Sequence, residues 1–251
     1  VFAETFNQQH NNGMDLNGDL GTNFFNVSGP TVTPFSSNGG ASTVTAQIIP
    51  NTGLSQLTTN DYELSYDGTN WQVTSSDGTT SASVLTAVGQ IDFDGLQFNF
   101  AGGPHVPGDS FTVRPTFSGA RTLDVVVTDP NLIAAAAPIR TLSSDANLGD
   151  VTISPGVVTT KPNTALLPVS LTFRTSVVTP PDIVLISDRA VTVGTTNYAI
   201  GTEIPYTKGM QIDSDGNGWQ VNLTGNPQVG DTFTIESNAG GVGDNRNMLS
   251  L

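Results

Sequence analysis

The sequence predicts a mainly β protein with two antiparallel β-sandwich or barrel-like domains, and short helical ends that belong to a truncated helical stem. Apolar and polar residues alternate with a period of two in many short segments, which is typical of half-buried antiparallel strands. Asp-Gly turn signals, as at residues 67–68, 77–78 and 94–95, separate these segments. One strand–loop–strand pattern also recurs in both halves of the chain.

Both ends of the chain are expected to be helical. An N-terminal helix would present an apolar face of Val1, Phe2 and Phe6. Gly13 is placed to end it in the left-handed conformation. A second helix would begin at Asp244 as N-cap. Its apolar face would consist of Met248, Leu249 and Leu251.

Seven alternating segments between these ends predict strands. Their apolar positions are Tyr62, Leu64 and Tyr66; Trp71 and Val73; Leu96, Phe98 and Phe100; Phe111 and Val113; Val169, Leu171 and Phe173; Trp219, Val221 and Leu223; and Phe233 and Ile235. One short helix is expected up to Ala137, with Asp129 as its cap and Pro130 at its first position.

The internal repeat indicates a duplicated β-hairpin module. Residues 96–106 align with residues 219–229, and, after one inserted residue, Pro107, residues 108–113 align with 230–235. Convergent turn chemistry is the alternative explanation for part of this match. We therefore predict the end of a stem helix and a connecting loop over 1–29, a first β domain over 30–138, a second over 139–241, and a return to the stem over 242–251.

Composition excludes several classes of function. Eight Lys and Arg residues against 22 Asp and Glu residues give a net charge of -14, the opposite of a nucleic-acid-binding footprint and unfavourable for anionic membranes. The absence of cysteine excludes disulfides, thiolate zinc sites and cysteine nucleophiles. No stretch approaches the roughly 20 apolar residues of a membrane span. The start shows no signal peptide and no initiating methionine, so we expect the middle of a longer chain.

Two acidic loops are candidate metal sites. Residues 213–218 have the Asp, Asp, Asn and Gly spacing of a calcium loop. Thr224 stands at the twelfth position, however, and strands flank the loop, which favours a tight hairpin turn. Weak calcium binding by Asp213, Asp215 and Asn217 remains open. In the loop from Asp15 to Gly21, we expect Gly18 and Gly21 to take positive φ values.

Candidate catalytic groups are few. The two histidines, His10 and His105, lie in no nucleophile motif and are expected to be solvated polar residues. Carboxylate pairs as in glycosidases are conceivable for Asp92 with Asp94 and for Glu203 with Asp213. Acids beside turns are, however, usually structural.

Other motifs also favour structural roles. Trp71 and Trp219 lie on the apolar phase of strands and are expected in the core rather than on a sugar-binding platform. Neither Gly39-Gly40 nor Gly240-Gly241 has the lysine or strand–helix context of a phosphate loop. We therefore predict no enzyme, no cofactor, and no catalytic, cofactor-binding or metal-binding residues.

The segment 3–21, followed by Phe24-Phe25, resembles the bacterial flagellar hook-associated proteins of the hook–filament junction. That family shows a helix ending in an FN-x-QH-like run, a Gly-x-Asp-x-x-Gly loop and paired phenylalanines. Further matching segments are 61–73, 93–96, 108–112 and 243–247. The resemblance covers about 1–137 and 243–251, so residues 139–241 would be an inserted outer domain.

The resemblance implies a mechanical role on the outside of the bacterium. Stem helices would pack into the axial tube, and the β domains would project from it. The implied partners are other copies of the chain in a ring, the hook protein, neighbouring hook-associated or filament proteins, and an export chaperone that binds a missing C-terminal region. Export would need no cleavable signal peptide. The chain by itself would be monomeric, with both termini at one pole.

Two other functions remain open at this point. An adhesin or ligand-binding β module on a surface appendage should show an exposed apolar patch. A glycosidase domain should show a cleft with perturbed carboxylates.

Overall fold

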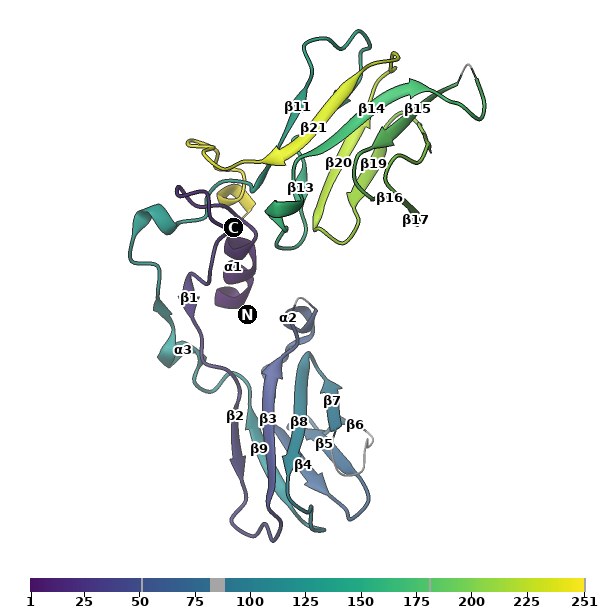
Figure 1. Ribbon diagram of the computed structural model, residues 1–251. Coiled ribbons are helices and arrows are strands. Elements are labelled where there is room, and N and C mark those ends of the chain that lie inside the picture. The colour runs from purple at the N-terminus through teal and green to yellow at the C-terminus, as the bar shows by residue number, and fades with distance from the viewer. Residues whose placement is uncertain (51, 82–88, 181, 251) are drawn as a thin grey trace. The chain divides into compact units, whose positions relative to one another are not determined.

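The computed structural model describes all residues except 51, 82–88, 181 and 251, and the mainly β prediction is confirmed (Figure 1). Helix α1 (Phe2–Asn11) begins the chain. The residues form two compact units. The first contains Val1–Gln8 and Phe24–Val126, and the second contains Gln9–Asn23 and Val127–Leu251.

The first unit contains a β domain of two antiparallel sheets. Its strands are β2 (Thr31–Pro34), β3 (Ser42–Ile48), β4 (Tyr62–Tyr66), β5 (Trp71–Ser75), β6 (Thr80–Ser81), β7 (Gly89–Phe93), β8 (Leu96–Gly102) and β9 (Ser110–Arg114). The sheet orders are β2-β9-β4-β5-β6 and β3-β8-β7. Alternation along β4, β5, β8 and β9 places one apolar face in a shared core, where Leu64, Phe98 and Val113 are fully buried.

The second unit contains a β domain of the same kind. Its strands are β11 (Ile139–Ser143), β12 (Thr152–Ile153), β13 (Val157–Val158), β14 (Val169–Thr175), β15 (Ile183–Ser187), β16 (Val191–Val193), β17 (Thr196–Tyr198), β18 (Ile204–Pro205), β19 (Met210–Ser214), β20 (Trp219–Thr224) and β21 (Thr232–Ser237). The sheet orders are β11-β21-β14-β15-β18 and β12-β20-β19-β16-β17, with β13 also on β20. Leu171, Val221 and Phe233 are fully buried in its core.

The remaining elements are short. They are β1 (Phe25–Asn26), which pairs with β10 (Asp124–Val125), the helices α2 (Gly53–Gln56) and α3 (Gly119–Thr122), and the 3-10 turns η1 (Pro130–Leu132), η2 (Thr164–Leu166) and η3 (Met248–Ser250).

The two β domains have one topology. Strands β11, β21, β14, β15 and β18 follow the order of β2, β9, β4, β5 and β6, and strands β12, β20 and β19 follow the order of β3, β8 and β7. The register agrees as well. Leu64 lies opposite Phe111 in the first domain, as Leu171 lies opposite Phe233 in the second. The second domain adds the hairpin of β16 and β17.

In the structure, the one additional residue of the first domain lies at a different position from the one predicted by aligning the two repeats. The backbone N–H of Val106 donates to the Asp109 carboxylate, and the N–H of Gln228 donates to that of Asp231. Val106 therefore corresponds to Gln228 rather than to Val229. The additional residue of the first domain lies before Val106, and the predicted position at Pro107 is wrong.

Two predicted helices are much shorter than expected. Only η1 forms after Asp129, whose carboxylate accepts the N–H of Asn131 as a cap. The alanines that follow pair with other segments; the backbones of Ala136 and Met14 exchange two hydrogen bonds. At the C-terminal end only η3 forms, and Leu251 lies outside the described residues.

Candidate functional site: the connecting region

Residues 9–23, 130–138 and 238–250 of the second unit pack together, and we call them the connecting region. His10, at the end of α1, is its centre. His10 is fully buried, so the expectation of a solvated residue is wrong. Its Nδ1 lies 2.6 Å from the carbonyl oxygen of Thr22, and its Nε2 accepts the N–H of Ala134 at 2.9 Å. A neutral ring that is protonated on Nδ1 satisfies both groups.

Two glycines allow the segments to approach one another. A Cβ on Gly21 would lie 2.0 Å from the carbonyl oxygen of His10. A Cβ on Gly13 would lie 2.1 Å from Nδ2 of Asn247 and 2.3 Å from the oxygen of Ala134. Neither glycine has positive φ, contrary to expectation, whereas Gly18 does, at 83°. Close backbone contact, rather than a left-handed conformation, therefore requires glycine at these two positions.

Asn247 connects the returning chain to both other segments. Its side chain donates to the carbonyl oxygens of Ala134 at 2.7 Å and Gln9 at 3.1 Å. Its Oδ1 accepts from Nε2 of Gln9 at 2.7 Å. Because Asn247 is 5% exposed, these hydrogen bonds are shielded from water. The chain therefore leaves and re-enters the connecting region at one place.

Arg246 and Lys161 attach the second β domain to this region. The Arg246 guanidinium donates to the carbonyl oxygens of Pro155 and Ile139, both at 2.8 Å, and pairs with Asp244. Burial favours a higher pKa for Asp244, but its bonds to Arg246 outweigh this and hold the pKa below its usual value. Lys161 donates to the carbonyl oxygen of Gly21 at 2.9 Å.

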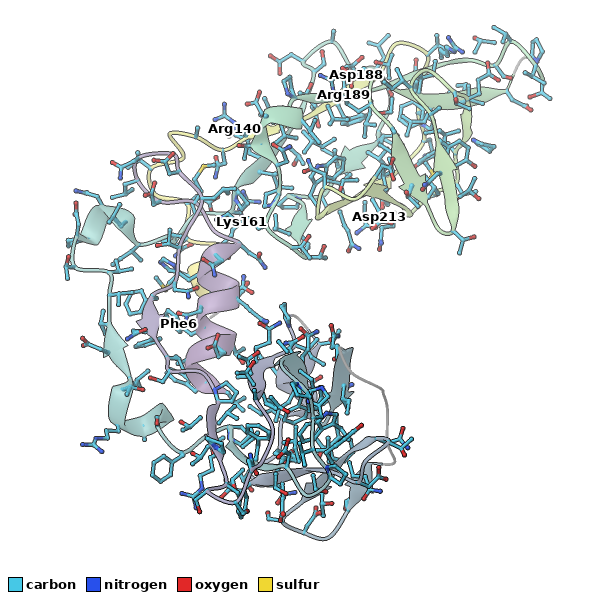
Figure 2. All side chains as sticks on the ribbon, turned by 60° about the horizontal axis from the view of Figure 1, so that its bottom comes forward. Phe6, Arg140, Lys161, Asp188, Arg189 and Asp213 are labelled. Atoms are coloured by element: carbon cyan, nitrogen blue, oxygen red, sulfur yellow. The ribbon has the colours of Figure 1, made fainter. Side chains whose placement is uncertain are left out.

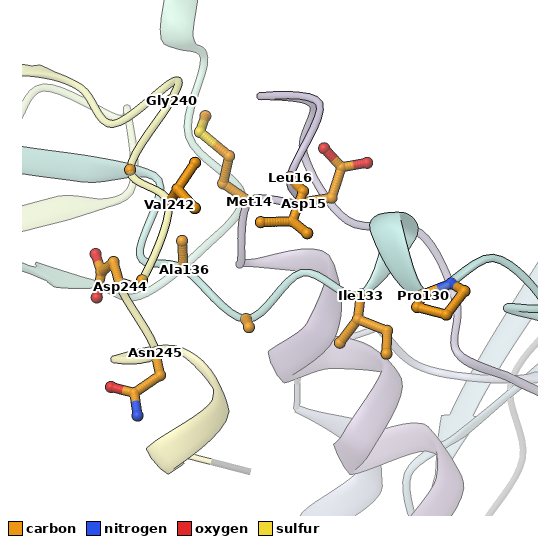
Figure 3. Close-up of a pocket in the computed structure, with 13 residues that line it drawn as sticks. Met14, Asp15, Leu16, Pro130, Ile133, Ala136, Gly240, Val242, Asp244 and Asn245 are labelled. Atoms are coloured by element: carbon orange, nitrogen blue, oxygen red, sulfur yellow. The ribbon is translucent and has the colours of Figure 1, made fainter.

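A pocket of about 240 Å³ opens beside these contacts (Figure 3). Met14, Ile133 and Ala136 contribute apolar lining, and the Gly240–Asp244 loop closes one side. Leu16 and Val242 line it with 54% and 79% of their surface exposed. Both carboxylates of its lining have partners: Asp15 accepts the N–H groups of Asn17 and Asp19, and Asp244 pairs with Arg246.

A phenylalanine cluster forms separately in the first unit. Phe6, labelled in Figure 2, packs with ring centroids 5.0 Å from Phe24 and 5.2 Å from Phe25. Asn7 fixes this pair, because its Oδ1 accepts the N–H groups of Phe24 and Phe25 and its Nδ2 donates to the carbonyl oxygen of Phe25. The apolar face of α1 that the sequence predicts, which includes Phe6, thus packs against the paired residues Phe24 and Phe25.

His105 is half-buried rather than solvated. Its Nδ1 lies 2.6 Å from Oγ of Ser42, which also donates to Asp109 at 3.3 Å. Serine stands between histidine and aspartate here, so the group lacks the order of a catalytic triad, in which histidine is the central residue. Asp109 also accepts the N–H groups of Gly39 and Gly40. The backbone N–H groups of these two glycines therefore bind a carboxylate of the chain itself.

The residues considered for calcium have separate partners. Asp213 accepts from Gln211, Asp215 from Asn197, and Asn217 from the backbone of Asn163. Within the described part of the chain, no group of three or more His, Asp or Glu side chains could hold a metal ion.

The acids that could conceivably form catalytic pairs accept hydrogen bonds from other groups. Asp92 accepts from Gln90, and Asp94 from the hydroxyl of Tyr62. Glu203 accepts from Val177 and Ser176, which hold its pKa below the usual value. Trp71 and Trp219 are buried core residues, as predicted.

Sequence reasoning missed Asn7 and Asn247, because their partners are backbone groups of distant segments. It also missed the turn aspartates Asp109 and Asp231, although the Gly-Asp dipeptide recurs in the repeat. No helix among the described residues is long and apolar enough to cross a membrane.

Comparison with known proteins supports the resemblance found in the sequence. Residues 35–115 match the D2-like domain of flagellar hook-associated protein 1. The chain is 38% identical over 150 residues to flagellar hook-associated protein 1 of Escherichia coli K12 and 34% identical over 152 residues to that of Salmonella typhimurium LT2. Over these segments the chain is similar to flagellar hook-associated protein 1.

The relationship to hook-associated protein 1 extends to the second β domain in one solved structure. The flagellar hook junction protein of Burkholderia pseudomallei matches 99% of the chain with a TM-score of 0.84 and 27% identity. The chain spans 48% of that protein, and 27% of the length of each of the two curated hook-associated protein 1 relatives. The similarity in sequence to those two covers 59% and 60% of the chain.

Proposed function

We propose that the chain is part of a structural component of the bacterial flagellum that joins the hook to the filament. The observation that carries this proposal is the match of 99% of the chain, at a TM-score of 0.84, to a flagellar hook junction protein. The β domains would project from the axial tube, and the connecting region would lead the chain towards it.

The connecting region supports a mechanical role. Gln9 and Asn247 are 238 positions apart and are hydrogen bonded twice. A chain that leaves and returns at one point can carry a β domain as an outward excursion from a stem. We propose that 1–29 is the end of a stem helix with its connecting loop, 30–138 the first outer domain, 139–241 an inserted second outer domain, and 242–251 the return to the stem helix. Duplication of one module accounts for the shared topology of the two β domains.

The carboxylates favour a structural rather than a catalytic role. Each resolved Asp or Glu shift among the described residues is downward, as at Asp109, Asp150 and Glu203. A general acid at neutral pH needs a raised pKa. The carboxylates with lowered pKa values are instead held ionised as hydrogen-bond acceptors in loops. This favours a protein without enzymatic activity.

The same proposal implies the partners and the location. In the flagellum the full-length protein would contact hook and filament components, with copies of itself in a ring and an export chaperone before secretion. It would be exported without a cleavable signal peptide. The 251-residue chain alone would be monomeric, and sedimentation that detects a stable ring would contradict this.

Complementation tests the proposal. In a flagellated strain without its own hook-associated protein 1, the full-length parent protein should restore attached filaments, whereas the uncomplemented strain should release filament protein into the medium. Gly21→Ala in the full-length protein should reduce filament attachment, because it forces His10 and Gly21 apart. Gly29→Ala is the matched control, since no atom lies within 4 Å of its Cβ position. Full export of the parent protein without attached filaments would contradict the proposal.

A further inference from the structure

One end of the second β domain contains a cavity of about 230 Å³. It lies between η2, the turn from β15 to β16, and the turn from β19 to β20. The residues that line it are Leu166, Val169, Arg189, Ala190, Ser214, Asp215, Asn217 and Trp219. Val169 and Trp219 are 3% and 2% exposed and form its apolar part. The other β domain shows what this position in the fold can hold.

Tyr62 occupies the equivalent position in the first β domain. Tyr62 lies opposite Val113 in β9, as Val169 lies opposite Ile235 in β21. The Tyr62 side chain is 1% exposed, and its ring lies 6.0 Å from that of Phe93 in an edge-on arrangement. The second domain has the same backbone position but only the branched side chain of valine, so the volume of a phenol ring is missing there.

The neighbouring ring is also missing in the second domain. Phe93 ends β7 in the first domain, and Ser214 ends β19 in the second. Trp219 takes the position of Leu96 and recovers part of the volume. Its Nε1 is buried and has no hydrogen-bond partner among the described residues. The cavity therefore arises where two aromatic side chains of the first domain are replaced by small ones.

Polar groups lie beside both positions, and Asp215 follows Ser214 in the second domain as Asp94 follows Phe93 in the first. In the first domain the Tyr62 hydroxyl donates to Asp94 at 3.1 Å and lies 2.7 Å from the Thr58 hydroxyl. Burial is the main cause that raises the pKa of Tyr62 to about 12. In the second domain Arg189 and Asp215 line the cavity. The Arg189 guanidinium makes no ion pair within the described part of the chain.

We propose that this cavity binds the phenol ring of a small ligand, in the place that the Tyr62 side chain fills in the first domain. Cavities for drug-sized ligands are usually larger, about 300–1,000 Å³, so the space suits a single ring. Apolar cavities of about 150 Å³ are known to take up benzene. The hydroxyl of the ligand would accept from Arg189 and donate to Asp215, whose charges balance, so an uncharged phenol fits better than an anion.

The test is a titration of the 251-residue chain with p-cresol, which is the side chain of tyrosine as a free molecule. The chain has two tryptophans, so each indole N–H gives one resolvable resonance. We expect a saturable shift for Trp219 with a dissociation constant on the order of 1 mM, typical of so small a ligand. Trp71, in the first domain, should not shift. Absence of a saturable Trp219 shift, or equal shifts of both resonances, would overturn the proposal.

Two variants fill the cavity from within. Val169→Tyr and Ser214→Phe each restore a ring of the first domain and should weaken p-cresol binding at least ten-fold. The two are independent, so one remains informative if the other does not fold. Unchanged binding in a folded variant would place the ligand elsewhere and contradict the proposal.

A separate variant tests the proposed contact between the hydroxyl of the ligand and Arg189. Arg189→Gln should weaken p-cresol binding several-fold and leave toluene binding unchanged, because toluene lacks the hydroxyl; equal effects on both would refute the assigned orientation. A second arm uses N-acetyltyrosinamide. Binding of both phenols would show that the site also admits tyrosine side chains, and binding of p-cresol alone would restrict it to small phenols. Either result supports the cavity as a phenol site.

Discussion

Asp109 in the first β domain and Asp231 in the second occupy the same position and bind the same backbone groups of their domains. Each is 1% exposed. Asp109 accepts the N–H groups of Gly39, Gly40 and Val106, and Asp231 accepts those of Leu148, Gly149 and Gln228. Each carboxylate thereby joins the turn before its own strand to a loop earlier in the chain, 70 residues away for Asp109 and 83 for Asp231. The two domains therefore share a hydrogen-bonding arrangement as well as a topology.

Removal of this charge should destabilise either domain. Asp109→Asn and Asp231→Asn each replace one of two acceptor oxygens with an NH2 group, which cannot accept from a backbone N–H. This should lower the free energy of unfolding by about 1.5–3 kcal/mol. Urea unfolding followed by circular dichroism measures the effect. Asp145→Asn, at an exposed position, is the matched control and should change stability by less than about 0.5 kcal/mol.

The same two residues predict acid sensitivity. Burial favours a higher pKa for Asp109 and for Asp231, but their backbone hydrogen bonds outweigh it, so both pKa values lie below normal in the folded chain. Their contribution is therefore complete above the unfolded value of about 4 and is lost as pH falls through the lower folded values. Urea midpoints measured from pH 7 to pH 3 should fall less in the Asp109→Asn, Asp231→Asn double variant. An identical fall in both proteins would contradict this origin.

The sequence predicted strands well where burial and alternation coincide. Strands β4, β8 and β20 have one strongly apolar face, and each was expected. Strand β3 (Ser42–Ile48) is not predicted by the sequence pattern, because it has few large apolar residues. Strand β15 is apolar on both faces, so no alternation marks it.

The contacts of the connecting region were predicted less well, because they join residues that are distant in the sequence. The alanines after Leu132 favour a helix by propensity, but the N–H of Ala134 is used by His10 and that of Ala136 by Met14. Tertiary hydrogen bonds override a local preference of this size. A histidine at the end of a polar helix likewise gives no sign that it will be enclosed by segments 12 and 124 positions away.

The glycines of the connecting region should be intolerant of alanine. Gly13→Ala and Gly21→Ala each bring a methyl group within 2.1 Å of another atom, so the segments must separate, at a cost of about 1–3 kcal/mol or more. Thermal unfolding of the chain measures this. Gly29→Ala, where the added methyl meets no atom within 4 Å, should leave the midpoint nearly unchanged; a comparable loss there would refute the close-contact explanation.

His10→Ala should destabilise the connecting region. The substitution leaves the N–H of Ala134, which is fully buried, without its acceptor, and such a group costs about 1–3 kcal/mol. We expect about 1–3 kcal/mol less stability by urea unfolding, and faster hydrogen exchange at the Ala134 amide. His105→Ala, in the other unit, should leave that amide protected. Because Nε2 of His10 is the acceptor for this N–H, unchanged exchange in His10→Ala would show that another group protects it.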